Sequence, residues 1–141
     1  MLRVVLDTDV IVAALRSPAG ASAELLRLAA LGYLQIMAST ALMIEYEAVC
    51  TRPQHQQEAG YTRQQVTHYL DGLAALIEPI ETHFLWRPRL NDPDDEMVLE
   101  VAINGHADCI VTFNITDFVN AAREFAIDII RPGNALQRIR I

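Results

Sequence analysis

The sequence predicts a three-layer α/β/α fold, in which helices cover both faces of a central parallel sheet of four to five strands. Two observations lead to this prediction. Short apolar, β-branched segments alternate along the chain with segments of helical apolar spacing, as is typical of parallel strands joined by right-handed crossovers. The 141 residues, 52% hydrophobic and 21% charged, suit one compact core, so residues 1–141 are expected to form a single domain.

The first half of the chain opens with an apolar segment that carries two aspartates. We interpret the N-terminal segment MLRVVLDTDVIVAALRS as a buried first strand, whose clearest part is residues 3–6 (RVVL), which are mostly apolar or β-branched and end at Asp7. The aspartates interrupt the apolar run that a secretory signal would have. The next expected elements are a helix over 22–31 stopped by Gly32, a strand over 34–38, and a helix from an N-cap at Ser39 or Thr40 to Cys50, with Pro53 beyond it.

The second half of the chain continues the alternation. Residues 53–60 (PQHQQEAG) are predicted to be a solvated loop, and Thr62 is predicted to cap a helix that runs to about Leu76. Residues 87–95 (RPRLNDPDD) are rich in turn-forming residues. The remaining expected elements are strands over 76–80, 108–112 and 126–130, a helix over 94–104 closed by Gly105, and a short helix over 133–138.

The composition argues against several classes of protein. No apolar run reaches the roughly 18 residues that span a bilayer, so no membrane association is expected. Cys50 and Cys109 lack metal-ligand spacing and are too few for a disulfide scaffold, so we expect reduced core residues in a cytoplasmic protein. A net charge of −7 argues against a broad basic face for nucleic acid. All 11 basic residues are arginine.

Acidic residues follow the carboxyl ends of several predicted strands. Asp7 and Asp9 follow the first strand, Glu45 lies in the helix after the second, and Asp117 comes shortly after the strand over 108–112. The helix after the third strand opens with an acidic group made of Asp92, Asp94 and Asp95. Because the carboxyl ends of parallel strands share one edge of a sheet, four separate segments could deliver carboxylates to one pocket.

Such a pocket favours a divalent cation. Neighbouring carboxylates raise one another's pKa, and a bound cation removes their repulsion. Oxygen ligands without a nearby histidine favour Mg²⁺ or Mn²⁺ over zinc, and the matching chemistry is attack of metal-activated water on a phosphodiester. Taken singly, most of these acids fit helix caps or solvated positions, but Asp7 continues a buried strand, where an unpaired carboxylate is costly. Loop or surface roles are expected for the histidines, His55, His68, His83 and His106.

In this order along the chain, the motifs resemble those of the PIN-domain family, which includes the VapC-type toxins of bacterial toxin–antitoxin pairs. The segment VVLDTDVIVAAL resembles the family's opening strand and turn, with Asp9 where asparagine is usual. The family's SxxLxxEY pattern is matched by Ser39, Leu42, Glu45 and Tyr46. Residues 91–118 resemble the third and fourth acidic blocks of the family, so the resemblance covers nearly the whole chain.

The resemblance implies roles for individual residues. Catalytic, metal-binding roles are implied for Asp7, Glu45, Asp95 and Asp117. Supporting or alternative roles are implied for Asp9, Ser39, Asp94, Thr112 and Asn114. Asp94 replaces Asp95 if the DPDD turn slips by one residue, and many members have an acid where Asn114 stands. Arg16, near the first acidic turn, is a candidate for substrate binding.

The expected function is therefore that of a Mg²⁺- or Mn²⁺-dependent endoribonuclease, the toxin of a toxin–antitoxin pair. The resemblance further implies an RNA substrate, a homodimer and a cognate antitoxin protein. LDTDV also resembles the opening of haloacid-dehalogenase-like phosphatases, with Asp7 as nucleophile, but that chemistry normally needs a lysine and this chain has none. A non-catalytic PIN-like binding module is a further alternative, against which the retained acids argue.

Overall fold

The centre of the fold is a sheet of five parallel strands in the order β3-β2-β1-β4-β5. The computed structural model describes residues 1–83 and 92–139. The strands are β1 (Leu2–Leu6), β2 (Leu34–Ala38), β3 (Ile77–Pro79), β4 (Cys109–Val111) and β5 (Asp128–Ile130). Val4 lies opposite Ile36 of β2 and Cys109 of β4, so β1 occupies the middle of the sheet. The predicted parallel sheet is confirmed.

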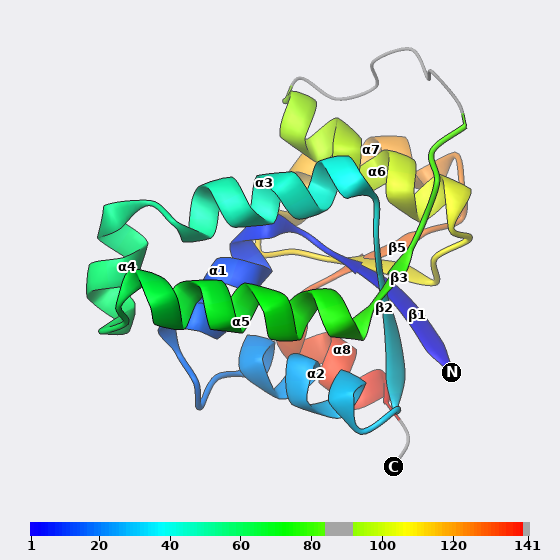
Figure 1. Ribbon diagram of the computed structural model, residues 1–141. Coiled ribbons are helices and arrows are strands. Elements are labelled where there is room, and N and C mark those ends of the chain that lie inside the picture. The colour runs from blue at the N-terminus through cyan, green and yellow to red at the C-terminus, as the bar shows by residue number, and fades with distance from the viewer. Residues whose placement is uncertain (84–91, 140–141) are drawn as a thin grey trace.

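Helices cover both faces of this sheet, which confirms the three-layer α/β/α architecture. The described residues form α1 (Thr8–Arg16), α2 (Ala21–Ala30), α3 (Thr40–Cys50), α4 (Pro53–Ala59), α5 (Arg63–Leu76), α6 (Pro93–Asn104), α7 (Ile115–Arg123) and α8 (Pro132–Arg138). Figure 1 shows α3, α6 and α7 on one side of the sheet and α2 and α8 on the other. Val4, Val5 and Leu6 are fully buried, as expected for a strand covered on both faces.

The first aspartate ends β1 and begins a helix that the sequence did not predict. Asp7 has an extended backbone and is the N-cap of α1, because its carboxylate accepts a hydrogen bond from the backbone N–H of Thr8 at 2.8 Å. The buried residues of α1 are Val10, Ile11, Val12, Ala14 and Leu15. Interpreting this apolar run as part of the first strand was wrong, because Val10, Ile11 and Val12 are consecutive β-branched residues that favour a strand, and a short continuous apolar run cannot be assigned from its period alone.

The segment 53–60 forms helix α4 and not the predicted loop. Pro53 stands at the first turn of α4, where its fixed φ suits a helix and its missing N–H costs nothing. Gly60 ends the helix in the left-handed conformation with a φ of 72°. The polar composition of the segment reflects a helix with an exposed face, and α4 packs against α1 and α3.

The other predicted elements agree closely with the structure. Ser39 caps α3, Thr62 caps α5 through a reciprocal capping box with Gln65, and Gly105 follows the end of α6. Residues 115–123 were not assigned to any element, but they form helix α7. Residues 87–91 of the turn-rich segment lie outside the described residues. Both cysteines are free and buried, and no helix in the described ranges is long and apolar enough to cross a membrane.

Tyr46 links α3 to the end of β1. Its side chain is fully buried and its hydroxyl donates a hydrogen bond to the carbonyl oxygen of Leu6, immediately before Asp7. We expect Tyr46→Phe to lower the free energy of unfolding by about 1–2 kcal/mol, because the Leu6 carbonyl loses this partner while the ring keeps its packing. Urea denaturation measures the change, and the partly exposed Tyr33→Phe is the matched control. Equal stability of the two variants would contradict the structural role of the Tyr46 hydroxyl.

Candidate active site

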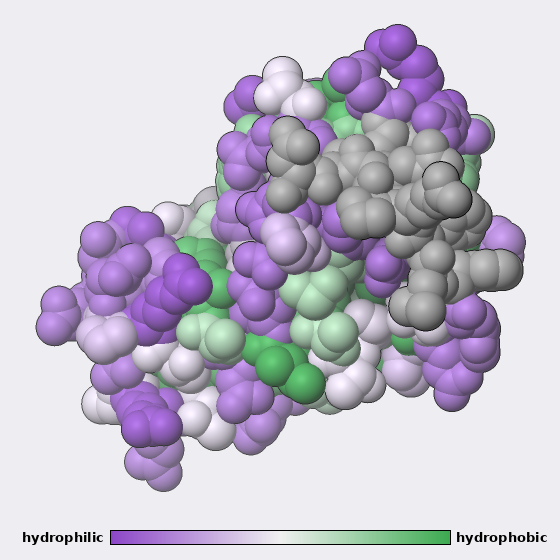
Figure 2. All heavy atoms as spheres, turned by 90° about the horizontal axis from the view of Figure 1, so that it is seen from above, coloured by the Kyte–Doolittle hydropathy of each residue, from purple (hydrophilic) through white to green (hydrophobic). Residues whose placement is uncertain are grey.

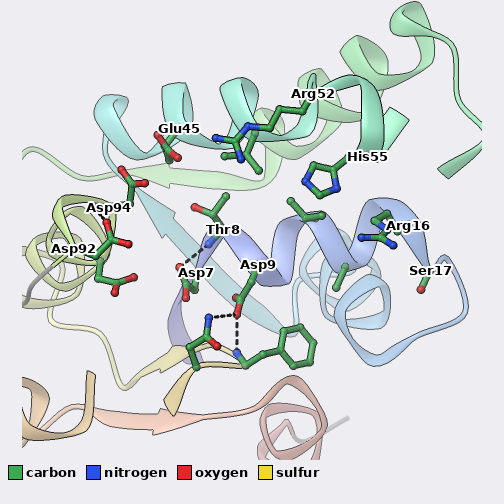
Figure 3. A pocket seen from close by; sticks show the side chains of 16 residues that line it. Asp7, Thr8, Asp9, Arg16, Ser17, Glu45, Arg52, His55, Asp92 and Asp94 are labelled. Carbon is green, nitrogen blue, oxygen red and sulfur yellow. Dashed lines mark hydrogen bonds between the residues drawn. The ribbon is translucent and has the colours of Figure 1, made fainter. Parts of the chain in front are cut away.

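A pocket of about 570 Å³ opens where β1 and β4 end, between α1, α3 and the start of α6. It is lined by carboxylates from three separate parts of the chain, namely Asp7, Asp9, Glu45, Asp92, Asp94 and Asp95. Figure 3 shows Asp7 and Asp9 in the middle of the pocket, with Glu45, Asp92 and Asp94 toward one end. The parallel topology therefore brings together acids that are as many as 88 positions apart (95 − 7).

Asp7 is the most buried of these acids, with 7% of its surface exposed. One carboxylate oxygen accepts from the N–H of Thr8, and the other accepts from the hydroxyl of Thr112 at 2.7 Å. Burial raises the pKa of Asp7, these hydrogen bonds oppose the rise, and the charge of Asp117 adds to it. The carboxylate is thus held in one orientation at a place where its negative charge is poorly solvated.

Asp9 lies two residues after Asp7, in the first turn of α1, and is held by the loop after β4. Its Oδ2 atom accepts from the N–H of Phe113 at 3.0 Å and from the side-chain amide of Asn114 at 3.3 Å. Its Oδ1 atom is buried and has no hydrogen-bond partner among the described residues. Burial, followed by the charge of Asp7, raises the pKa of Asp9 to about 6. In this arrangement Asn114 orients Asp9 by donating a hydrogen bond to it.

The start of α6 supplies three acids whose surroundings differ. Asp92 caps the helix by accepting from the N–H of Asp94 at 2.9 Å. Asp95 is partly buried, and burial followed by the charge of Asp7 raises its pKa to about 7. Asp94 is exposed and acts on Glu45, whose pKa is raised first by burial and then by the charge of Asp94. The sequence left Asp94 and Asp95 as alternatives for the metal-binding acid. Of these two, Asp95 is the one whose pKa is raised by the charge of Asp7.

The other residues singled out from the sequence lie around this pocket in different ways. Asp117 is exposed in the first turn of α7, and its charge raises the pKa of both Asp7 and Asp95. Ser39 serves its own helix, since its buried hydroxyl accepts from the N–H of Leu42 at 3.1 Å. Arg16 lines the pocket and forms an ion pair with Glu58 of α4.

A family comparison agrees with this geometry. The sequence model of the PIN domain matches residues 3–116. The chain belongs to the PIN-domain family. The matched range includes the acids of β1–α1, α3 and α6, and it ends one residue before Asp117. The resemblance to haloacid-dehalogenase-like phosphatases, by contrast, covers little more than LDTDV.

Solved structures contain a similar fold. The PIN-domain chain is similar to a chain in the crystal structure of VapBC2 from Rickettsia felis bound to a DNA fragment from their promoter. The two chains have 16% sequence identity and a TM-score of 0.60, and the match covers 91% of this chain and 97% of that one. At this level of identity the likeness establishes the shared fold. No curated protein sequence gives a significant match.

Two basic residues of the PIN-domain pocket were missed from the sequence. His55 was expected to have a loop or surface role, but it lies on α4, is partly buried and lines the pocket beside Arg52. His55 lies on α4 and Arg52 is its N-cap residue, so predicting a loop over 53–60 meant that neither was expected in the pocket. The signal that was available is the pair of helix boundaries, Pro53 at the start of the segment and Gly60 at its end.

The chemistry of the PIN-domain pocket fits a divalent cation, although its side chains are not arranged around one. Within residues 1–83 and 92–139, no three His, Cys, Asp or Glu side chains are close enough together to hold a metal ion. Burial and repulsion nevertheless raise the pKa of Asp7, Asp9, Glu45 and Asp95, and a cation would relieve both effects. The buried, unpartnered Oδ1 of Asp9 is also available as an oxygen donor.

Proposed function

We propose that this PIN domain is a Mg²⁺- or Mn²⁺-dependent endoribonuclease that hydrolyses phosphodiester bonds in RNA. The observation that carries the proposal is the convergence of carboxylates from β1–α1, α3 and α6 on one pocket where burial and repulsion raise their pKa values. A group of acids kept this close is costly without a bound cation, and such costs are typical of functional sites. Membership of the PIN-domain family supports the same conclusion.

In this proposal Asp7, Glu45 and Asp95 hold the cation, and Asp117, which does not line the pocket but whose charge acts on Asp7 and Asp95, is a fourth acid. When bound, the cation would activate water and stabilise negative charge on the scissile phosphate. The protein's own contribution is orientation. The Thr112 hydroxyl donates a hydrogen bond to Asp7 and accepts one from the N–H of Asn114 at 2.9 Å, while the Asn114 side chain donates to Asp9. The residues that follow β4 therefore hold both Asp7 and Asp9 in place.

We also propose that the chain is the toxin of a toxin–antitoxin pair, acts as a homodimer and is neutralised by a cognate antitoxin in the cytoplasm. The similarity of fold to a VapBC2 chain supports this role. Apolar side chains are available to a protein partner, since Ile44 of α3 is 62% exposed and Phe113 beside the pocket is 41% exposed. Figure 2 shows apolar patches among hydrophilic side chains on one face of the molecule.

Purified protein is expected to cleave single-stranded RNA when Mg²⁺ or Mn²⁺ is added and to lose this activity in EDTA. The same samples should neither hydrolyse a small phosphomonoester nor form a beryllium fluoride adduct at Asp7, because the nucleophile is water and not the carboxylate. Gel analysis of labelled RNA, a chromogenic phosphatase assay and mass spectrometry measure the three outcomes. Phosphorylation of Asp7 without RNA cleavage would favour the phosphatase, and inactivity in every assay would favour the binding module.

A further inference from the structure

One end of the pocket is basic, although the net charge of the chain is −7. In Figure 3, His55 and Arg16 lie toward the end opposite Glu45, Asp92 and Asp94, and the Arg52 side chain lies between the two ends. Arg16 comes from the last turn of α1, Arg52 is the N-cap residue of α4, and His55 lies within α4. In a chain of net charge −7, basic side chains from two helices therefore line the same cavity as the acids.

The two arginines at this end are available for a ligand to different degrees. Ion pairs hold several arginines elsewhere, namely Arg3 with Glu78, Arg27 with Glu24 and Arg138 with Asp128. Arg16 is paired with Glu58, which anchors one side of a guanidinium that has five N–H donors in all. Arg52 makes no side-chain hydrogen bond or ion pair within the described part of the chain, and its positive charge acts on Glu45 and His55.

His55 adds an uncharged donor beside these arginines. Its Nδ1 atom is buried and has no partner among the described residues, so a proton is better placed on Nε2. Burial, followed by the charges of Arg16 and Arg52, lowers the pKa of His55 below its ordinary value. At neutral pH the ring is therefore uncharged, and its Nε2–H can donate a hydrogen bond without repelling the two guanidinium groups.

We propose that Arg16, Arg52 and His55 form a subsite for an unreacting phosphate of the RNA chain, next to the phosphate that is cut at the acidic end. This inference rests on the proposed function and deepens it. The planar fork of an arginine matches phosphate oxygens, and a neutral N–H completes such a site.

The subsite also accounts for how an acidic protein holds a polyanion. A broad basic face is not needed if one phosphate binds at the cation and a neighbouring phosphate binds at Arg16 and Arg52. Few counterions are then released on binding, so the affinity for RNA should depend only weakly on salt, with a slope of about one per phosphate contact.

Arg52→Gln tests the subsite with Arg63→Gln as its control. Arg63 is exposed at the start of α5 and does not line the pocket, and both changes remove one positive charge. We expect Arg52→Gln to weaken binding of a fluorescent single-stranded oligoribonucleotide about tenfold and to reduce the salt slope by about one, while Arg63→Gln changes neither. Fluorescence anisotropy in the Asp7→Asn background measures binding to uncut RNA, and cleavage kinetics in the parent should show a raised KM with a nearly unchanged kcat.

A pair of substitutions at His55 separates its hydrogen bond from its packing. His55→Gln keeps an N–H donor, whereas His55→Leu fills similar space without one. We expect His55→Leu to weaken RNA binding by roughly three- to tenfold and His55→Gln to retain most of the affinity. Equal affinities of the Leu and Gln variants would remove His55 from the subsite.

The outcomes distinguish this inference from the proposed function. If the parent cleaves RNA but Arg52→Gln and Arg63→Gln bind it equally well, the subsite is wrong and the nuclease stands. If the parent neither cleaves nor binds RNA with Mn²⁺ present, the proposed function and the subsite both fail. A loss confined to Arg52→Gln and His55→Leu supports the subsite.

Discussion

Asp7→Asn is expected to reduce RNA cleavage by roughly a hundredfold or more while the PIN domain remains folded. Asp7 is the buried carboxylate at the centre of the pocket, and its loss removes a negative charge that the proposed cation requires. The fold should survive because asparagine also caps helices well and can still accept from the N–H of Thr8. Cleavage rates at saturating Mn²⁺ measure the effect, and circular dichroism measures the fold.

The thermal stability of Asp7→Asn is a second measurable effect of this substitution. Because burial raises the pKa of Asp7, the ionised carboxylate destabilises the metal-free protein at neutral pH, and asparagine should leave its melting temperature unchanged or higher. Asp71→Asn, at an exposed position of α5, is the matched control and should alter neither activity nor stability. Unchanged cleavage by Asp7→Asn would eliminate the proposed metal site.

In the absence of metal, the stability of the protein is expected to fall as the pH rises from about 5.5 to 8. Asp9, with a pKa of about 6, and Asp95, with a pKa of about 7, bind a proton more tightly in the folded protein than in the unfolded chain. Their protonation therefore stabilises the folded state at low pH, and this stabilisation is lost as the pH passes through these values. Solvent screens both partly exposed groups, so we expect a loss of about 2 kcal/mol rather than the full effect of the shifts.

Urea denaturation across this pH range, with and without Mn²⁺, measures that loss. Asp95→Asn should reduce the pH dependence, leaving the contribution of Asp9 and the opposite contribution of His55, whose pKa is lowered by burial. Mn²⁺ at a hundred times its dissociation constant should add about 2.7 kcal/mol at pH 8 and less at pH 5.5, where protons compete for the carboxylates. A metal-free protein that is more stable at pH 8 than at pH 5.5 would show that the acids do not repel one another.

The order of the strands along the chain, and the acidic residues that follow their carboxyl ends, could be predicted because both depend on the local sequence pattern. Residues 3–6 and 34–38 are short apolar segments that a sheet buries on both faces, and β1 and β2 lie there. Helix boundaries carried side-chain signals as well, since Ser39 and Thr62 cap their helices. The parallel topology then required acids such as Asp7 and Glu45 to meet at one edge of the sheet.

Three helices, α1, α4 and α7, were not predicted, and the local patterns of α1 and α4 are ambiguous. The apolar run of α1 is short, continuous and rich in β-branched residues, so it also fits a strand, and α4 is so polar that composition favours a loop. Their identity depends on packing, because α1 contacts α2, α3 and α4. His55 lies on α4 and Arg52 is the N-cap residue of that helix, so the basic end was not predicted once α4 was missed.

Sequence by itself determined which residues carry charge, where the strands end and, through parallel pairing, which edge of the sheet becomes acidic. Only the tertiary structure decided how residues adjacent in sequence differ in their interactions. Asp95 is coupled to Asp7 whereas Asp94 acts on Glu45, and Asn114 orients Asp9 by donating a hydrogen bond. The physical reason is that burial and distance between side chains set the strength of electrostatic interactions, and neither quantity is defined until the helices have packed around the sheet.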